Sequence, residues 1–159
     1  MNRFIFCVSL LFFSCSQQSN TSTAGTSFFP LVPVNITLLL SDPAYNQLTL
    51  QPGNWVYLNG GYNGIIVYHT INDEYMAFDR TCPVNTFDTC AYVSMDSSNI
   101  FLSCSKTHVI GPVCNKSNAG ICKSTFFPDT GFPRSGTAKV PLKQYVSKIS
   151  NGYLYITNN

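Results

Sequence analysis

Short strand-like runs constrain the fold of this 159-residue chain more than any other sequence feature. Val, Ile, Tyr and Phe gather in brief segments, and turn formers such as Asn, Gly and Asp separate them. The segments that predict strands are residues 35–40, 55–58, 64–70, 74–79, 99–103 and 153–157. Helical periodicity is absent over any long window, and one short helical turn is expected at 43–48. The sequence therefore predicts an all-β fold of small antiparallel sheets.

The C-terminal segment contains the clearest hairpin signal. Asn151 and Gly152 separate the strand-like runs 146–149 and 153–156. A type I′ turn needs positive φ at both central residues, which Asn and Gly accept. We therefore expect the last two strands to pair directly across this turn.

The N-terminal residues resemble an export signal. Arg3 precedes an apolar run at 4–13, which is too short to span a bilayer. The tetrad 12–15 resembles a bacterial lipobox and predicts cleavage of residues 1–14 and acylation of Cys15. Residues 15–33 then form a lipidated tether, and residues 34–159 form the folded domain. Ordinary secretion, with cleavage a few residues later, is the alternative.

These features predict a location in the bacterial cell envelope. The lipid anchor would hold the chain on a membrane, and by analogy with other lipoproteins Ser16 favours the outer membrane. Thiols outside the cytoplasm tend to oxidise.

Five cysteines follow Cys15, namely Cys82, Cys90, Cys104, Cys114 and Cys122, and His108 lies among them. An odd number cannot all pair within the chain, so either one thiol stays free or some sulfurs bind a metal. Oxidation outside the cytoplasm favours two disulfides. A metal site is the alternative at this stage.

Charge is sparse and unevenly distributed. Between residues 15 and 100 the only basic residue is Arg80, whereas after residue 100 the only acidic residue is Asp129. Either the C-terminal half forms a docking face for an anionic partner, or strands from the two halves pair and their charges mix. A net charge of +2 without a basic run argues against nucleic acid as a partner.

Signatures of catalysis are absent from the sequence. The two histidines, His69 and His108, are far apart, and no phosphate loop or zinc-protease motif is present. Asp79 lies near a predicted turn, where a solvated carboxylate is expected. His69 lies within a predicted strand and is expected at its surface or edge. The chain is therefore not expected to be an enzyme.

Two segments resemble Rieske-type iron–sulfur domains, in particular a divergent group of lipoproteins from Bacteroidetes-like bacteria. They are GIIVYHTINDEYMAFDRTCP at 64–83 and the run 122–156, with a strand ending in Cys104 between them. The positions that match the framework downstream of the second loop are Ser124, Phe126, Thr130, Gly131, Gly136, Thr137, Ala138, Pro141 and Leu142. The resemblance implies a Rieske-like fold with two cysteine-bearing loops.

The resemblance also locates the ligand positions, and these depart from the family pattern. A Rieske cluster uses two thiolates and two imidazoles. Cys82 and Cys104 match the thiolate positions, but Val84 and Cys122 fall at the imidazole positions. Cys82, Cys104 and Cys122 with either His108 or Cys114 could instead hold a 2Fe-2S cluster or zinc. The alternative is that Cys82, Cys90, Cys104 and Cys122 form two disulfides.

The resulting prediction is a lipid-anchored envelope protein with a degenerate Rieske-like domain. It is expected to carry no cofactor and to be cross-linked by disulfides. Its expected role is that of a binding or assembly module for another envelope protein. The alternative is an electron-transfer protein with a 2Fe-2S cluster of non-standard Cys and His ligation, and zinc is the remaining metal candidate.

Overall fold

The computed structural model describes residues 29–84, 86, 91–105 and 123–158. The predicted signal peptide and Cys15 lie outside these ranges, as do Cys90, His108, Cys114 and Cys122. The predictions made for these residues therefore remain predictions. Within the described ranges, no helix has the length and apolar character that crossing a bilayer requires.

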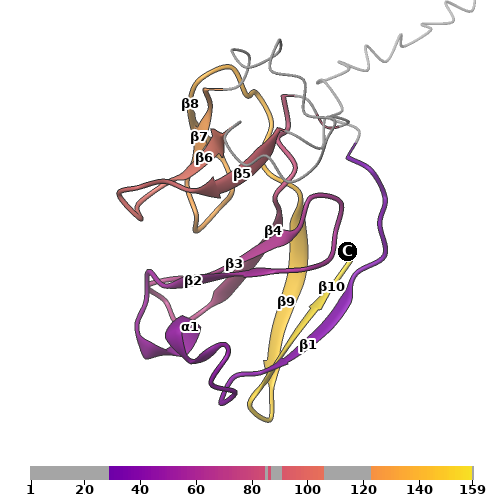
Figure 1. The fold of residues 1–159 in the computed structure, drawn as a ribbon, viewed down its shortest axis with the longest axis vertical. Helices are drawn as coiled ribbons and strands as arrows, with labels where there is room; N and C mark the ends of the chain where they lie inside the picture. The colour runs from indigo at the N-terminus through magenta and orange to yellow at the C-terminus, as the bar shows by residue number, and fades with distance from the viewer. Residues whose placement is uncertain (1–28, 85, 87–90, 106–122, 159) are drawn as a thin grey trace, which may run out of the picture.

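Two antiparallel sheets make up the described part of the chain, which confirms the predicted all-β class (Figure 1). The strands of the larger sheet, in spatial order, are β1 (Asn35–Leu39), β10 (Tyr153–Thr157), β9 (Gln144–Ser150), β4 (Tyr75–Asp79), β3 (Ile65–His69) and β2 (Trp55–Leu58). Those of the smaller sheet are β5 (Tyr92–Met95), β6 (Leu102–Ser105), β7 (Thr125–Phe126) and β8 (Pro133–Ser135). One short helix, α1 (Asn46–Leu50), precedes β2.

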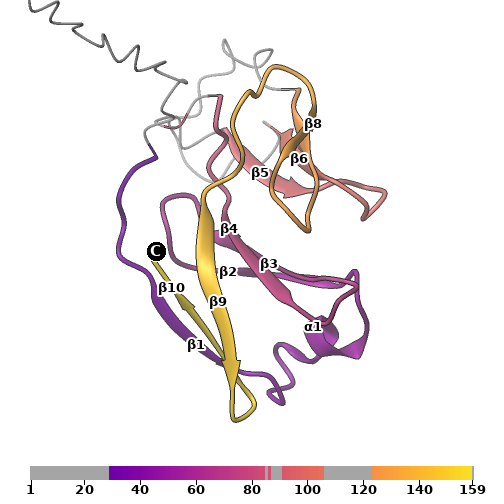
Figure 2. The ribbon, with the colours of Figure 1, turned by 180° about the vertical axis from the view of Figure 1, so that it is seen from behind.

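Strands β3 and β4 are buried on both faces, because each contributes to two separate cores. Ile65 and Val67 face a core within the large sheet. Ile66 and Phe78 instead face a core shared with the small sheet. Side chains alternate between the faces of a strand, so a strand with both faces covered reads as a continuous apolar run. The figures agree on this arrangement, with the small sheet lying over the end of the large sheet that contains β3 and β4 (Figure 2).

Pairing across the chain confirms part of the sequence interpretation. Asn151 and Gly152 have φ values of 52° and 79° and connect β9 to β10, as the hairpin prediction requires. β1 pairs with β10 and β4 pairs with β9. Strands from the acidic and basic halves therefore lie side by side, as the second interpretation of the charge pattern predicted.

The strand that carries Cys104 begins later than predicted. Residues 99–103 were expected to be a strand that Cys104 closes, but β6 spans Leu102–Ser105 and contains Cys104. Asn99 has a φ of 57° and lies in a turn, in which the Asp96 carboxylate accepts the amide of Ile100 at 3.2 Å. The first residues of the predicted strand therefore belong to a polar turn.

Arg80 links the two sheets immediately after β4. Its guanidinium carbon lies 3.9 Å from the ring centre of Tyr57 and 4.8 Å from that of Tyr92, and its Nε donates to the Val93 carbonyl at 2.8 Å. Burial lowers the pKa of Arg80 from its usual value. These contacts fix the start of the loop that carries Cys82 between β2 and β5.

Candidate functional site

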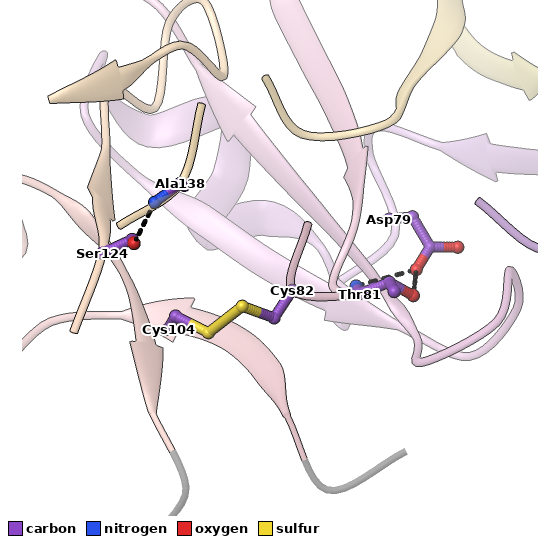
Figure 3. Close-up of a disulfide and its surroundings, with 6 residues drawn as sticks. All are labelled: Asp79, Thr81, Cys82, Cys104, Ser124 and Ala138. Carbon is purple, nitrogen blue, oxygen red and sulfur yellow. Dashed lines mark hydrogen bonds between the residues drawn. A yellow bond between two sulfur atoms is a disulfide. The ribbon is translucent and has the colours of Figure 1, made fainter. Parts of the chain in front are cut away.

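A disulfide joins Cys82, on the loop after β4, to Cys104 of β6 (Figure 3). The two Cα atoms are 6.0 Å apart, within the range that disulfides occupy. The Cys82 amide donates to the Ala91 carbonyl at 3.0 Å, and the Cys104 amide donates to the Ser124 carbonyl at 2.9 Å. Backbone pairing on both sides thus holds the two sulfurs in reach of each other.

The disulfide lies inside the core shared by the two sheets. Cys82 is fully buried and Cys104 is nearly so. The other buried members of this core are Ile66, Phe78, Ala91, Val93, Met95, Leu102, Phe126, Ala138 and Leu142. Apolar surroundings disfavour charged thiolates and suit an uncharged disulfide.

The segment that begins at Ser124 lies beside Cys104, and hydrogen bonding and close packing fix its position. Its residues belong to the positions that resemble the Rieske framework. The Ser124 hydroxyl accepts the Ala138 amide at 2.8 Å (Figure 3). Gly136 has a φ of +94°, and a Cβ there would lie 2.5 Å from the Ser124 Cα. Gly131 has a φ of +70°, and a Cβ there would lie 2.6 Å from the Phe78 ring. Both positions require glycine, because the backbone has a positive φ there and because a Cβ would collide with neighbouring atoms.

Asp79 is a buried acceptor at the base of the Cys82 loop. It is 1 % exposed, so the prediction of a solvated carboxylate was wrong. One carboxylate oxygen accepts the Tyr145 hydroxyl at 2.7 Å and the Tyr62 amide at 2.8 Å, and the other accepts the Thr81 amide at 2.9 Å and the Thr81 hydroxyl. Asp79 thereby joins β4, β9 and the turn between β2 and β3.

The buried Tyr145 phenol is expected to make the folded chain less stable at alkaline pH. Burial and the adjacent Asp79 carboxylate raise the pKa of Tyr145 from its usual value. In the unfolded chain this phenol ionises near its ordinary pKa of about 10, whereas in the folded chain it stays neutral. Its contribution is thus fully present below about pH 10 and falls above it. Urea unfolding at pH values below and above about 10 measures the effect. The free energy of unfolding should fall more steeply with rising pH for the native chain than for Tyr145→Phe, and equal falls would contradict this account.

His69 is also buried, so its predicted position at the surface was wrong. It ends β3, where its ring stacks on Tyr75 with centres 4.6 Å apart. Its Nε2 lies 3.1 Å from the Asp73 carboxylate. The sequence prediction failed because it assumed that β3 had one solvated face.

The described residues do not fit a Rieske cluster. Val84, at one implied imidazole position, has no ligand atom and packs partly buried against the shared core. In the parts of the chain that the structure describes, no three His, Cys, Asp or Glu side chains are grouped to hold a metal. The sulfurs at both implied thiolate positions are bonded to each other.

The fold and the site together define a two-sheet β domain with a buried disulfide between its sheets. No protein-family model matches the chain, and no curated protein matches it. Solved structures do show similarity. A chain in the complex of reduced oxygenase and oxidized ferredoxin in carbazole 1,9a-dioxygenase is 21% identical, with a TM-score of 0.45 and coverage of 71% of this chain and 88% of that one.

Two further solved structures are similar over more of this chain. The ferredoxin of carbazole 1,9a-dioxygenase from Nocardioides aromaticivorans IC177 is 16% identical, with a TM-score of 0.45 and coverage of 81% of this chain and 100% of that one. A protein described as the small subunit of an NADH-dependent nitrite reductase from Mycobacterium tuberculosis is 16% identical, with a TM-score of 0.41 and coverage of 81% and 98%.

Proposed function

We propose that this chain is a lipid-anchored module of the bacterial cell envelope whose Rieske-like domain binds a partner protein and carries no iron–sulfur cluster. The observation that carries the proposal is the disulfide between Cys82 and Cys104. The family resemblance assigns both positions to thiolate ligands. A sulfur in a disulfide is not a thiolate, which is the form that ligates iron.

The remaining ligand positions support the same function. A Rieske cluster also needs two imidazoles, and Val84 occupies one of those positions. The disulfide lies where the cluster ligands of the family would be, and it connects the loop after β4 to β6. The domain would thus keep the scaffold of an electron carrier while a covalent bond replaces the metal. Its role would be non-catalytic binding.

Metal analysis tests the proposal. The full chain, isolated without oxygen from an iron-replete culture, is expected to be colourless and to contain iron and acid-labile sulfide far below one equivalent. Peptide mapping without reduction should recover Cys82 linked to Cys104. A brown protein with stoichiometric iron and sulfide would overturn the proposal and support the electron-transfer alternative with non-standard ligation.

Attachment to the membrane is tested at Cys15. Mass spectrometry of the mature protein should find an acylated Cys15 as the first residue, because the lipoprotein peptidase cuts before the modified cysteine. Cys15→Ala should leave the precursor uncleaved by that enzyme. An unmodified N-terminus at another residue would contradict the anchor.

A further inference from the structure

The large sheet splits between β4 and β9. Their ladder consists of two residue pairs, Ala77 with Tyr145 and Phe78 with Gln144. Beyond these pairs the strands diverge (Figures 1 and 2). A cavity of about 600 Å³ lies in the opening. We call it the split groove, and its lining residues are Asp73, Glu74, Tyr75, Met76, Gln144, Tyr145, Val146, Ser147 and Ile149.

Backbone groups of both strands face the split groove. The Asp79 amide donates to the Lys143 carbonyl at 2.8 Å, so alternate residues of β4, Ala77 and then Tyr75, direct their peptide groups toward β9. The same alternation directs the peptide group of Ser147 toward β4. Among the described residue pairs of this sheet, none joins Tyr75 to Ser147 across the opening. The groove therefore has strand edges that an added strand could use.

Side chains of β9 show that the core is open at this point. Ile149 lies on the same face of β9 as the buried Tyr145, yet it is 46% exposed. The Ser147 hydroxyl lies between these two residues and is buried with no hydrogen-bond partner in the described structure. An apolar side chain of a ligand would cover Ile149, and a polar backbone group would satisfy Ser147.

The edge of the groove near the start of β4 is acidic. Asp73 has an 86% exposed side chain, and its contact with His69 uses one carboxylate oxygen. Glu74 beside it is also exposed. Among the described residues, no ion pair joins Lys148 of β9 to Asp73 or Glu74, so this edge keeps its negative charge unpaired by that lysine. Lys or Arg side chains of a ligand would complement this edge.

We propose that the split groove binds an extended segment of a partner protein in which Lys or Arg alternates with small apolar residues. The segment pairs with the Tyr75 edge of β4 as an added strand, covers Ile149 and places its cations beside Asp73 and Glu74. This inference rests on the proposed function, for which it specifies the partner and the binding surface.

Two short synthetic peptides test the inference, one alternating Lys with Val and the other alternating Glu with Val. Binding to the full chain is followed by fluorescence anisotropy of labelled peptide, and hydrogen exchange reports on individual amides. We expect the basic peptide to bind at least about tenfold more tightly than the acidic one. It should also slow exchange at Tyr75 and Ser147. Equal binding of the two peptides, or unchanged exchange at these amides, would overturn the inference.

Matched variants locate the site. Glu74→Lys should weaken binding of the basic peptide by about tenfold, whereas Asp129→Lys, the same charge change outside the groove, should leave it unchanged. Equal effects of the two variants would contradict the site. Mass measurements at several concentrations show whether the chain self-associates, and self-association that slows hydrogen exchange at Tyr75 and Ser147 would also contradict the inference. Iron content is measured on the same sample, so a metal-free chain that binds no peptide refutes the groove and leaves the proposed absence of a cluster standing.

Discussion

Loss of the Cys82–Cys104 disulfide is expected to lower the free energy of unfolding by about 3 kcal/mol. The bond connects residues 22 positions apart, and a closed loop of that length restricts the unfolded chain by roughly this amount in the chain-entropy account. The corresponding fall in melting temperature is about 10 °C for a domain of this size. Thermal unfolding of Cys82→Ala/Cys104→Ala against the native chain measures it, and the double variant leaves the other cysteines intact.

A reductant distinguishes the disulfide from general packing. Val93→Ala removes two methyl groups from the same core and should lower stability to a similar degree with and without reductant. The native chain should lose stability only when reduced, and the double cysteine variant should lose nothing further from this bond. A chelator should not change the unfolding curve. If a chelator lowers the stability of the native chain, or if a reductant leaves that stability unchanged, the structural disulfide is contradicted.

Asp79→Asn is expected to cost about 3 kcal/mol of stability, although it changes the shape of the side chain very little. Both carboxylate oxygens accept hydrogen bonds, from Tyr145 and Tyr62 on one and from Thr81 on the other. An asparagine amide would direct N–H groups toward one of these sets of donors and leave them unsatisfied in a buried site. Urea unfolding at neutral pH measures the loss.

Two variants control for the loss of charge and of one partner. Asp129→Asn removes an exposed carboxylate and should change stability by less than about 0.5 kcal/mol. Tyr145→Phe removes one of the hydrogen bonds to Asp79 and should cost about 1 kcal/mol. If Asp79→Asn is no more harmful than Asp129→Asn, the buried network does not hold the Cys82 loop.

The sequence predicts the strands whose signals are local. Asn151 and Gly152 supply the backbone conformation that their turn needs, so the hairpin could be predicted from these two residues. Residues 55–58 and 153–157 coincide with β2 and β10. The strands β5, β7 and β8 were not predicted. Two of them, β7 and β8, are runs of two and three residues, which have no detectable periodicity.

The site depended on tertiary contacts that no local pattern contains. Asp79 and His69 were assigned to solvent from their residue types and the neighbouring turns, whereas β3 and β4 are covered on both faces. The continuous apolar run at 65–68 is the sequence signal that indicates such a strand. The choice of Cys104 as the partner of Cys82 depends on pairing between the loop after β4 and a strand in the other sheet. From the sequence, disulfides and metal ligation both remained open for the same cysteines.

Electron paramagnetic resonance of the full chain tests the central claim most directly. The protein would be prepared without oxygen from an iron-replete culture and reduced with dithionite, so that any 2Fe-2S cluster becomes paramagnetic. With Cys82 and Cys104 bonded to each other, we expect no iron–sulfur signal. A signal whose average g value matches mixed Cys and His ligation would show that a Rieske-type cluster forms, and would contradict the account.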